Sequence, residues 1–186
     1  MKALTEGPLL WYLDRSSGLL TMLLLTLSTV LGVLSTRGRA GRRVPAFVTQ
    51  NLHRNISLLA VSLLVLHLVT SVAHEFVDIR WWNVFVPFGS PYEPLLVGMG
   101  AVAVDLILLV VITSLLRDRL QHGHWRLIHA TSYLAWAVGS VHGFFLGTDT
   151  AHRPWSTVTL ACVGVVAISA LFRLVVLAKP ELERVR

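Results

Sequence analysis

The sequence predicts an all-α integral membrane protein, a single domain (residues 1–186) in which five spanning helices form a bundle. Hydrophobic residues make up 54% of the 186-residue chain, and the mean hydropathy is +0.68. These residues form long runs, too many for the core of one soluble domain, and each run is near the roughly 20 residues that a helix needs to cross a bilayer. The runs are Leu9–Leu34, Ile56–Phe76, Leu95–Leu116, Leu127–Leu146 and Val158–Leu177.

We place the five helices, in order, at about residues 9–34, 53–77, 95–117, 125–147 and 156–178. The first run is too long for a signal-peptide core, so we expect it to be retained. The single cysteine, Cys162, allows no intrachain disulfide and no multi-cysteine metal site. Glycines and prolines mark the connections between the helices: Gly38, Gly41, Pro45, Pro87, Gly89, Pro91, Pro94, Gly123 and Pro154.

Basic residues predict the orientation in the membrane. Twelve of the sixteen follow the first helix, separate the third from the fourth, or end the chain: Arg37, Arg39, Arg42, Arg43, Arg54, Arg117, Arg119, Arg126, Arg173, Lys179, Arg184 and Arg186. The positive-inside rule places these segments in the cytoplasm, so we expect a multi-pass protein of the cytoplasmic membrane with its N-terminus outside and its C-terminus inside. The net charge of +6 is then a topology signal. We expect membrane lipid and no nucleic acid as a partner, because a basic stripe with interleaved aromatics is missing.

Two of the predicted helices each carry a pair of histidines. His53 and His67 are 14 residues apart on the second helix, and His129 and His142 are 13 apart on the fourth. These spacings correspond to a rise of about 20 Å, which fits two levels within a hydrocarbon core of about 30 Å. Both helices run from inside to outside, so His53 and His129 share the inner level and His67 and His142 the outer one.

Paired imidazoles at matched depth favour a specific chemistry. Neutral imidazole is a good axial ligand of haem iron, and two imidazoles fill both axial positions, which favours electron transfer. A lone membrane histidine can instead serve helix packing or a proton relay. For four histidines at two matched levels we favour two stacked b haems, with iron held by His53 and His129 at the inner site and by His67 and His142 at the outer site.

The 13-residue spacing requires an irregular fourth helix. On an ideal helix it separates the two side chains by roughly 140°, whereas 14 residues return to within about 40° of the same face. A local distortion or rotation of the fourth helix, permitted by Gly139 or by Gly143 next to His142, would solve this. Alternatively the ligand set includes His74, seven residues after His67, or His124, eighteen before His142. The spacing alone leaves both solutions open.

The chain resembles the ferric reductase-like transmembrane domain family, which includes ferric reductases, NADPH oxidases and the haem subunit of the bacterial periplasmic methionine sulfoxide reductase system. The paired histidines are the specific feature, and the resemblance spans nearly the whole chain. It rests on Arg15–Gly18, Leu52–Asn55 with the later His67, Thr113–Ser114, Trp125 with His129 and Tyr133, His142–Gly143, and Gly147–Asp149. Larger relatives carry a C-terminal FAD and NAD(P)H module, which we do not find in this sequence, so we expect any oxidoreductase activity to need a separate flavoprotein partner.

The resemblance implies that the inner haem takes electrons from a cytoplasmic flavin and that the outer haem delivers them outside. By position, Arg54 and Arg126 are candidate propionate partners of the inner haem, and Arg15 and His74 of the outer one; ordinary interfacial roles are equally compatible. Trp136 lies between two of the histidines, where it either bridges the haems or, more commonly, packs in the core. Asp105 in the third helix is expected to pair within the bundle, for example with the free N–H of a ligand histidine.

We therefore expect a di-haem b electron-transfer subunit that receives electrons from a cytoplasmic flavoprotein reductase and passes them to an extracytoplasmic acceptor: ferric iron, dioxygen or a periplasmic redox protein. The flavin, FAD or FMN, is expected on the partner, and no residue of this chain is expected to be catalytic. A quinol-linked membrane cytochrome b is an alternative. A histidine-lined metal transporter is less favoured, because zinc needs three or four ligands at one level and each level here offers two.

Overall fold

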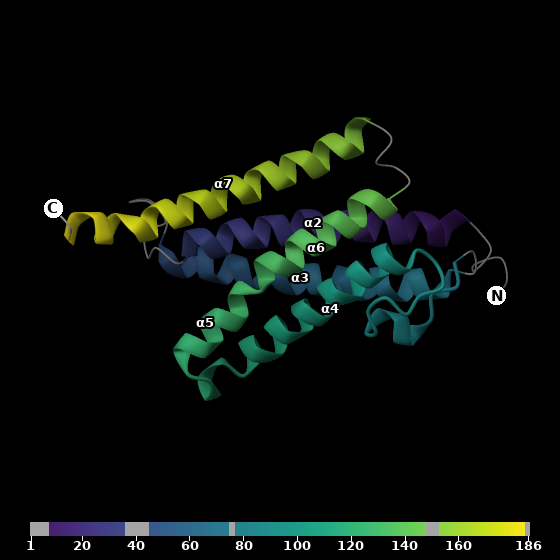
Figure 1. Cartoon of the computed structure of the whole chain (residues 1–186), viewed down its shortest axis with the longest axis horizontal. Coiled ribbons are helices and arrows are strands. Elements are labelled where there is room, and N and C mark those ends of the chain that lie inside the picture. Colours follow the sequence, from purple (N-terminus) through teal and green to yellow (C-terminus); the bar gives the residue numbers. More distant parts are fainter. Residues whose placement is uncertain (1–7, 36–44, 75–76, 148–152, 185–186) are drawn as a thin grey trace.

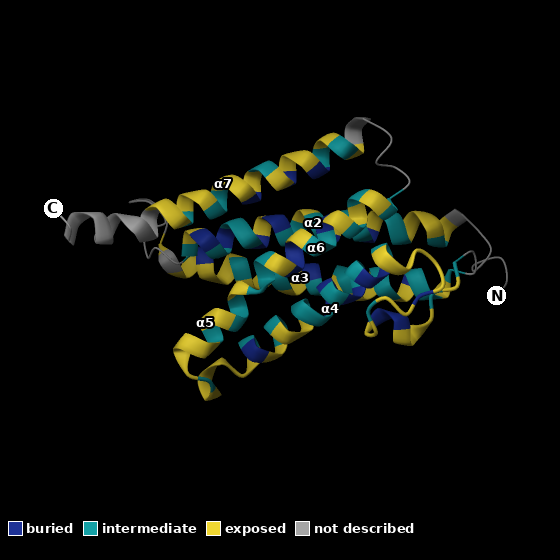
Figure 2. Cartoon of the chain, in the orientation of Figure 1, coloured by how far each residue is buried: buried dark blue, intermediate teal, exposed yellow. Residues whose placement is uncertain are grey.

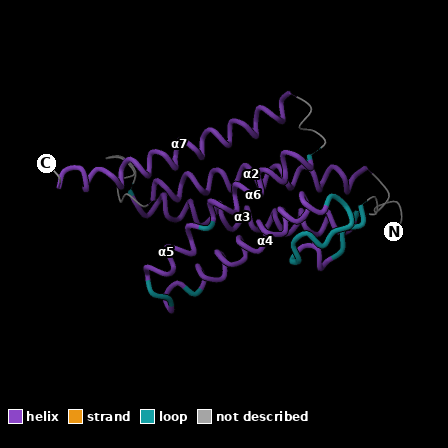
Figure 3. Tube along the Cα trace, viewed as in Figure 1, coloured by secondary structure: helices purple, strands orange, loops and turns teal. Residues whose placement is uncertain are grey.

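The computed structural model describes residues 8–35, 45–74, 77–147 and 153–184, and the described residues are helical with short connections (Figures 1 and 3). The α-helices are α2 (Pro8–Ser35), α3 (Ala46–Ala73), α4 (Pro94–Leu115), α5 (His122–Ala130), α6 (Ser132–Leu146) and α7 (Arg153–Arg184). Two short 3-10 helices, η1 (Trp81–Val84) and η2 (Arg117–Arg119), lie in the connections.

Four of the described helices are long and apolar enough to cross a membrane: α2, α3, α4 and α7. The prediction of an all-α fold is thus confirmed for the described residues, and the four apolar helices are compatible with a multi-pass membrane protein. The expected fourth span, by contrast, is divided between α5 and α6, and α6 has only 15 residues.

The division of the fourth helix falls at Thr131. Its N–H donates to the carbonyl of Ile128 at 3.0 Å, three residues back, and its hydroxyl donates to the same carbonyl at 2.7 Å. A threonine hydroxyl that competes for a helix carbonyl in this way disturbs the regular ladder. The irregularity expected between His129 and His142 is therefore confirmed, but it lies at Thr131 rather than at Gly139 or Gly143.

Two helix ends differ from the sequence prediction. Helix α3 begins at Ala46, directly after Pro45, about seven residues before the expected start, and ends at Ala73 rather than near residue 77. Its first turns are rich in polar residues, which apolar composition alone assigned to a loop. Helix α7 also extends beyond the expected 156–178 at both ends.

The helices pack as two antiparallel pairs. The most closely packed neighbours are α2 with α3 and α4 with α6, and α2 also contacts α6 and α7. Where these three helices meet, Trp136, Cys162 and Val166 form a buried cluster with Met22, Leu25 and Val158 packed against it. Exposed residues cover the outer faces of the helices (Figure 2), as expected for a surface in contact with lipid.

The segment between α3 and α4 folds back onto the start of α4. Phe88 and Glu93 adopt positive φ angles of 63° and 39°. The ring of Phe88 lies so close to Gly98 that a Cβ at this glycine would overlap it. Glycine at position 98 thus lets the segment pack against α4.

Candidate functional site

All four histidines direct Nδ1 toward a neighbouring helix. The Nδ1 of His53 lies 2.9 Å from the carbonyl oxygen of Ser28, and that of His142 lies 2.7 Å from the carbonyl oxygen of Leu96. The Nδ1 of His67 lies 3.1 Å from the carbonyl oxygen of Asp14.

These contacts determine which ring nitrogen is available. A carbonyl oxygen can only accept, so Nδ1 of His53, His67 and His142 carries a proton and donates it. In the neutral ring, Nε2 then has a free lone pair. A histidine that ligates a metal usually has this arrangement, with the second ring nitrogen bonded to a carbonyl or a carboxylate.

In the fourth histidine, His129, Nδ1 also faces an oxygen atom of a neighbouring helix, but at a longer distance. The Nδ1 of His129 lies 3.4 Å from the hydroxyl oxygen of Ser114 on α4. Since His142 also bonds to α4, both histidines of the α5–α6 segment face the same helix. The break at Thr131 lies between them.

Glycines lie next to three of the histidine rings. A Cβ built on Gly18 would lie 3.1 Å from the His67 ring, one on Gly32 3.4 Å from the His53 ring, and one on Gly100 2.8 Å from the His142 ring. The distance at Gly100 is too short for any Cβ, and the distance at Gly18 is tighter than most Cβ contacts, so glycine at these positions lets each imidazole approach the helix backbone.

The small residues that face the histidine rings repeat with the same sequence spacing as the histidines. Gly18 and Gly32 are 14 residues apart on α2, and Gly100 and Ser114 are 14 apart on α4. In the three glycine cases the carbonyl acceptor lies four residues before the glycine, on the same helix face. Each helix pair therefore holds two histidines, one toward each end. In each case a small residue faces the ring and an oxygen atom of the same helix lies beside Nδ1.

At one end of the bundle, His53 and His129 meet. Their ring centres are 6.2 Å apart, with the ring planes at 70°. Two imidazoles on opposite sides of one first-row metal ion, each about 2 Å from it, have ring centres roughly 6 Å apart. The two rings come from helices α3 and α5, which are not among the closely packed pairs.

The same end holds a stack that sequence reasoning did not assign to the site. Trp125 stacks on His129 with ring centres 5.0 Å apart, and the guanidinium of Arg117 lies 4.8 Å from the centre of the Trp125 ring. The indole Nε1 of Trp125 is buried and has no hydrogen-bond partner among the described residues. Trp125 is one of the residues on which the family resemblance rests, and this resemblance was the only sequence feature that could have assigned Trp125 to the site.

At the other end, an acid supports His67. One carboxylate oxygen of Asp14 lies 3.0 Å from Nδ1 of His67 and accepts hydrogen bonds from the hydroxyls of Thr70 and Ser71. His142 lies within electrostatic range of both His67 and Asp14. The acid that bonds to one of the four histidines is Asp14, whereas the sequence analysis considered Asp105 for such a role.

The remaining candidate residues are placed as follows. Trp136 is 8% exposed, packs in the α2–α6–α7 cluster and donates from Nε1 to the hydroxyl of Thr26 at 2.9 Å, which is a core-packing role. Arg15 follows Asp14 on α2, and its guanidinium lies 5.5 Å from the Trp11 ring centre. Arg54 and Arg126 are exposed next to the His53 and His129 end, and His74 caps α3.

Several residues named in the sequence analysis lie outside the described residues. They are Arg37, Gly38, Arg39, Gly41, Arg42, Arg43, Phe76, Thr148, Asp149 and Arg186. Among the described residues, no group of three or more histidine, cysteine, aspartate or glutamate side chains is arranged to hold a metal ion.

The described residues form a helical protein with four helices long and apolar enough to cross a membrane and two pairs of half-buried histidines, three of which bond through Nδ1 to a backbone carbonyl. The chain belongs to a family described only as a domain of unknown function (DUF8596), whose model matches residues 9–149. The matched segment contains α2 to α6 and all four histidines, and it ends before α7. No curated protein and no solved structure matches the chain.

Proposed function

We propose that this chain is a di-haem b electron-transfer subunit of the cytoplasmic membrane, in which α2, α3, α4, the interrupted α5–α6 helix and α7 form a five-helix bundle around two stacked haems. The observation that supports it best is the shared state of the histidines. Three have Nδ1 fixed as a donor to a backbone carbonyl, and Nε2 is left as a ligand atom.

The geometry of the inner pair supports this proposal. His53 and His129 would hold the inner iron, and their ring-centre separation of 6.2 Å suits two axial ligands of one metal. His67 and His142 would hold the outer iron. The buried Nε1 of Trp125 needs an acceptor, and the carboxylate of a haem propionate is a suitable one.

In this proposal the protein supplies position, electrostatics and insulation. A haem with two axial imidazoles transfers one electron at a time and has no open position for dioxygen. The carbonyls of Asp14, Ser28 and Leu96 hold their imidazoles in the ligating tautomer. Arg117, Arg126 and Arg54 lie at the His53 and His129 end of the bundle and would neutralise negatively charged propionates there, and Arg15 and His74 would do so at the opposite end.

The arginine-rich end is the proposed cytoplasmic side, where a flavoprotein reductase with FAD or FMN would donate electrons. An extracytoplasmic acceptor (ferric iron, dioxygen or a periplasmic redox protein) would receive them at the other end. This direction follows the resemblance to ferric reductase-like domains and the charge distribution. A quinol-linked cytochrome b shares the same ligand set and is distinguished by its donor.

The test is the haem content of the purified chain, expressed with ample haem. We expect about two haems b per chain and a red preparation. His53→Ala and His129→Ala should each reduce this to about one, whereas His122→Ala, a neighbouring histidine outside the pairs, should leave two. A colourless protein, or two haems retained in both His53→Ala and His129→Ala, would reject the proposal.

A further inference from the structure

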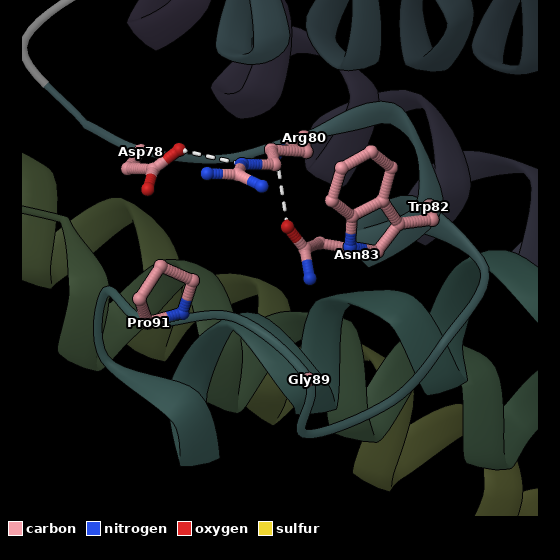
Figure 4. Close-up of a pocket in the computed structure, with 6 residues that line it drawn as sticks. All are labelled: Asp78, Arg80, Trp82, Asn83, Gly89 and Pro91. Carbon is pink, nitrogen blue, oxygen red and sulfur yellow. Dashed lines mark hydrogen bonds and ion pairs between the residues drawn. The ribbon is translucent and has the colours of Figure 1, made fainter.

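The segment between α3 and α4 encloses a second candidate site, separate from the histidines. A cavity of about 230 Å³ opens there (Figure 4), lined by Asp78, Arg80, Trp82, Asn83, Gly89 and Pro91. Cavities that hold drug-sized ligands measure roughly 300 to 1,000 Å³, so this one suits a smaller molecule.

The amide of Asn83 has a fixed orientation. Its Oδ1 lies 2.9 Å from the backbone nitrogen of Arg80, and a backbone N–H can only donate, so the atom facing it is the oxygen. The Nδ2 group consequently points away from Arg80, toward the loop that carries Gly89 and Pro91 (Figure 4).

This amide nitrogen is buried without a partner. Asn83 is only 1% exposed, and Nδ2 has no hydrogen-bond acceptor among the residues that the structure describes. Buried donors in native proteins are nearly always paired, because leaving one unpaired costs its lost hydration. The observation points to an oxygen atom supplied by a ligand.

The charges of the cavity wall balance. Nε of Arg80 donates to a carboxylate oxygen of Asp78 at 3.1 Å, and the guanidinium also lies 5.1 Å from the centre of the Trp82 ring. The two charged residues of the lining therefore form one ion pair without net charge. A neutral acceptor suits the neutral amide donor.

The surroundings of the cavity are aromatic. Trp81, Trp82, Phe85 and Phe88 of the same segment are each more than half exposed. Exposed aromatic side chains beside the end of a membrane helix are typical of the lipid–water interface. A ligand that partitions into this interface therefore has direct access to the cavity.

We propose that this cavity binds a small uncharged molecule whose carbonyl oxygen accepts a hydrogen bond from Nδ2 of Asn83, and that the molecule enters from the membrane interface. The inference does not depend on haem binding, since none of the four histidines lines the cavity.

The chain offers a simple spectroscopic test, because it contains only three asparagines: Asn51, Asn55 and Asn83. Labelling the full-length protein with [¹⁵N-amide]asparagine gives three side-chain amide signals, two of which report on α3. The probe is duroquinone, and its control is durene, which has the same ring and methyl groups without carbonyls. Duroquinone should shift the Asn83 signal saturably and leave the other two unchanged, and durene should shift none.

Two substitutions test the site itself. Gly89→Ala places a methyl group 3.5 Å from Nδ2 of Asn83, an ordinary contact distance that occupies the cavity without a clash. We expect it to weaken duroquinone binding at least about tenfold, as loss of this hydrogen bond would. Gly123→Ala is the matched control, since its Cβ would meet no atom within 4 Å.

Asn83→Asp keeps an oxygen for the N–H of Arg80 and removes the donor. Followed by ligand-detected NMR, it should bind duroquinone as weakly as Gly89→Ala does. The proposal is overturned if duroquinone does not shift the Asn83 signal, if durene shifts it equally, or if both variants bind normally. A shift with acetate but not with duroquinone would also overturn it, because the site would then select an anion.

Discussion

The carboxylate of Asp14 and Nδ1 of His67 lie 3.0 Å apart, across the interface between α2 and α3. The other three paired histidines bond to carbonyl or hydroxyl oxygens of Ser28, Ser114 and Leu96. A carboxylate partner makes an imidazole a stronger donor of electron density to a metal than a carbonyl does. The two proposed haem sites are therefore chemically unequal.

Asp14→Asn should raise the midpoint potential of one haem only. The substitution keeps an acceptor for His67 and removes the negative charge that stabilises the ferric state. A charged hydrogen bond contributes about 1.5–3 kcal/mol, so a rise on the order of 50 mV or more is expected. A spectroscopic redox titration measures it, with Asp105→Asn as the control. Equal shifts of both haems, or of neither, would contradict the assignment.

Gly100→Ala should empty the outer site while the inner one stays occupied. The new Cβ would lie 2.8 Å from the His142 ring, which must move away from α4. We expect the haem content to fall from about two to about one per chain. Gly143→Ala is a suitable comparison, because a Cβ there meets no atom within 4 Å, and it should retain both haems.

Trp136→Phe should lower the thermal stability without changing electron transfer between the haems. The variant loses the hydrogen bond to Thr26 and leaves space beside Cys162 and Val166. The cost is about 1–3 kcal/mol, visible as a lower Tm. Rapid-mixing spectroscopy of haem reduction gives the second measurement. If the rate falls severalfold while Tm is unchanged, Trp136 bridges the haems instead.

Reversing the charge of Arg119 and Arg126 should slow reduction by an acidic flavoprotein donor. Both side chains are exposed in the connection between α4 and α6, on the proposed cytoplasmic side. Long-range attraction raises association rates and is screened by salt, so the slowing should be about tenfold or more at low ionic strength and small at high salt. Haem content should not change in Arg119→Glu alone, because Arg119 is not among the proposed propionate partners. Equal rates at low salt would place the docking surface elsewhere.

Much of the architecture could be predicted from composition. The long apolar runs give α2 and α4 to within about a residue at each end. The start of α3 could not be found in this way, since its polar first turns have the composition of a loop. The position of the helix break at Thr131 could not be predicted either. The break depends on the hydrogen bond of a single threonine hydroxyl, and threonine is also common in regular helices.

The histidine pairs could be predicted from their sequence spacing, but the residues that contact the histidine rings could not. Gly18 and Gly32 are 14 residues apart in the sequence, but this spacing has a meaning only once α2 is known to pack antiparallel against α3. That packing aligns each glycine with a histidine. The sequence pattern did not single out Asp14 as a partner of a histidine. Its role depends on the register between two helices, and hydrophobic periodicity carries no information about that register.

The division of the ligands between the two helix pairs affects assembly of the protein. The α2–α3 hairpin supplies one imidazole to each level, and the α4–α6 segment supplies the other. A bis-histidine haem would therefore fasten one half of the chain to the other, twice. Each half could insert into the bilayer as a separate hairpin, and binding of the cofactor would then join them. We expect haem-starved cells to accumulate a chain that proteases cleave in the segment linking α3 to α4.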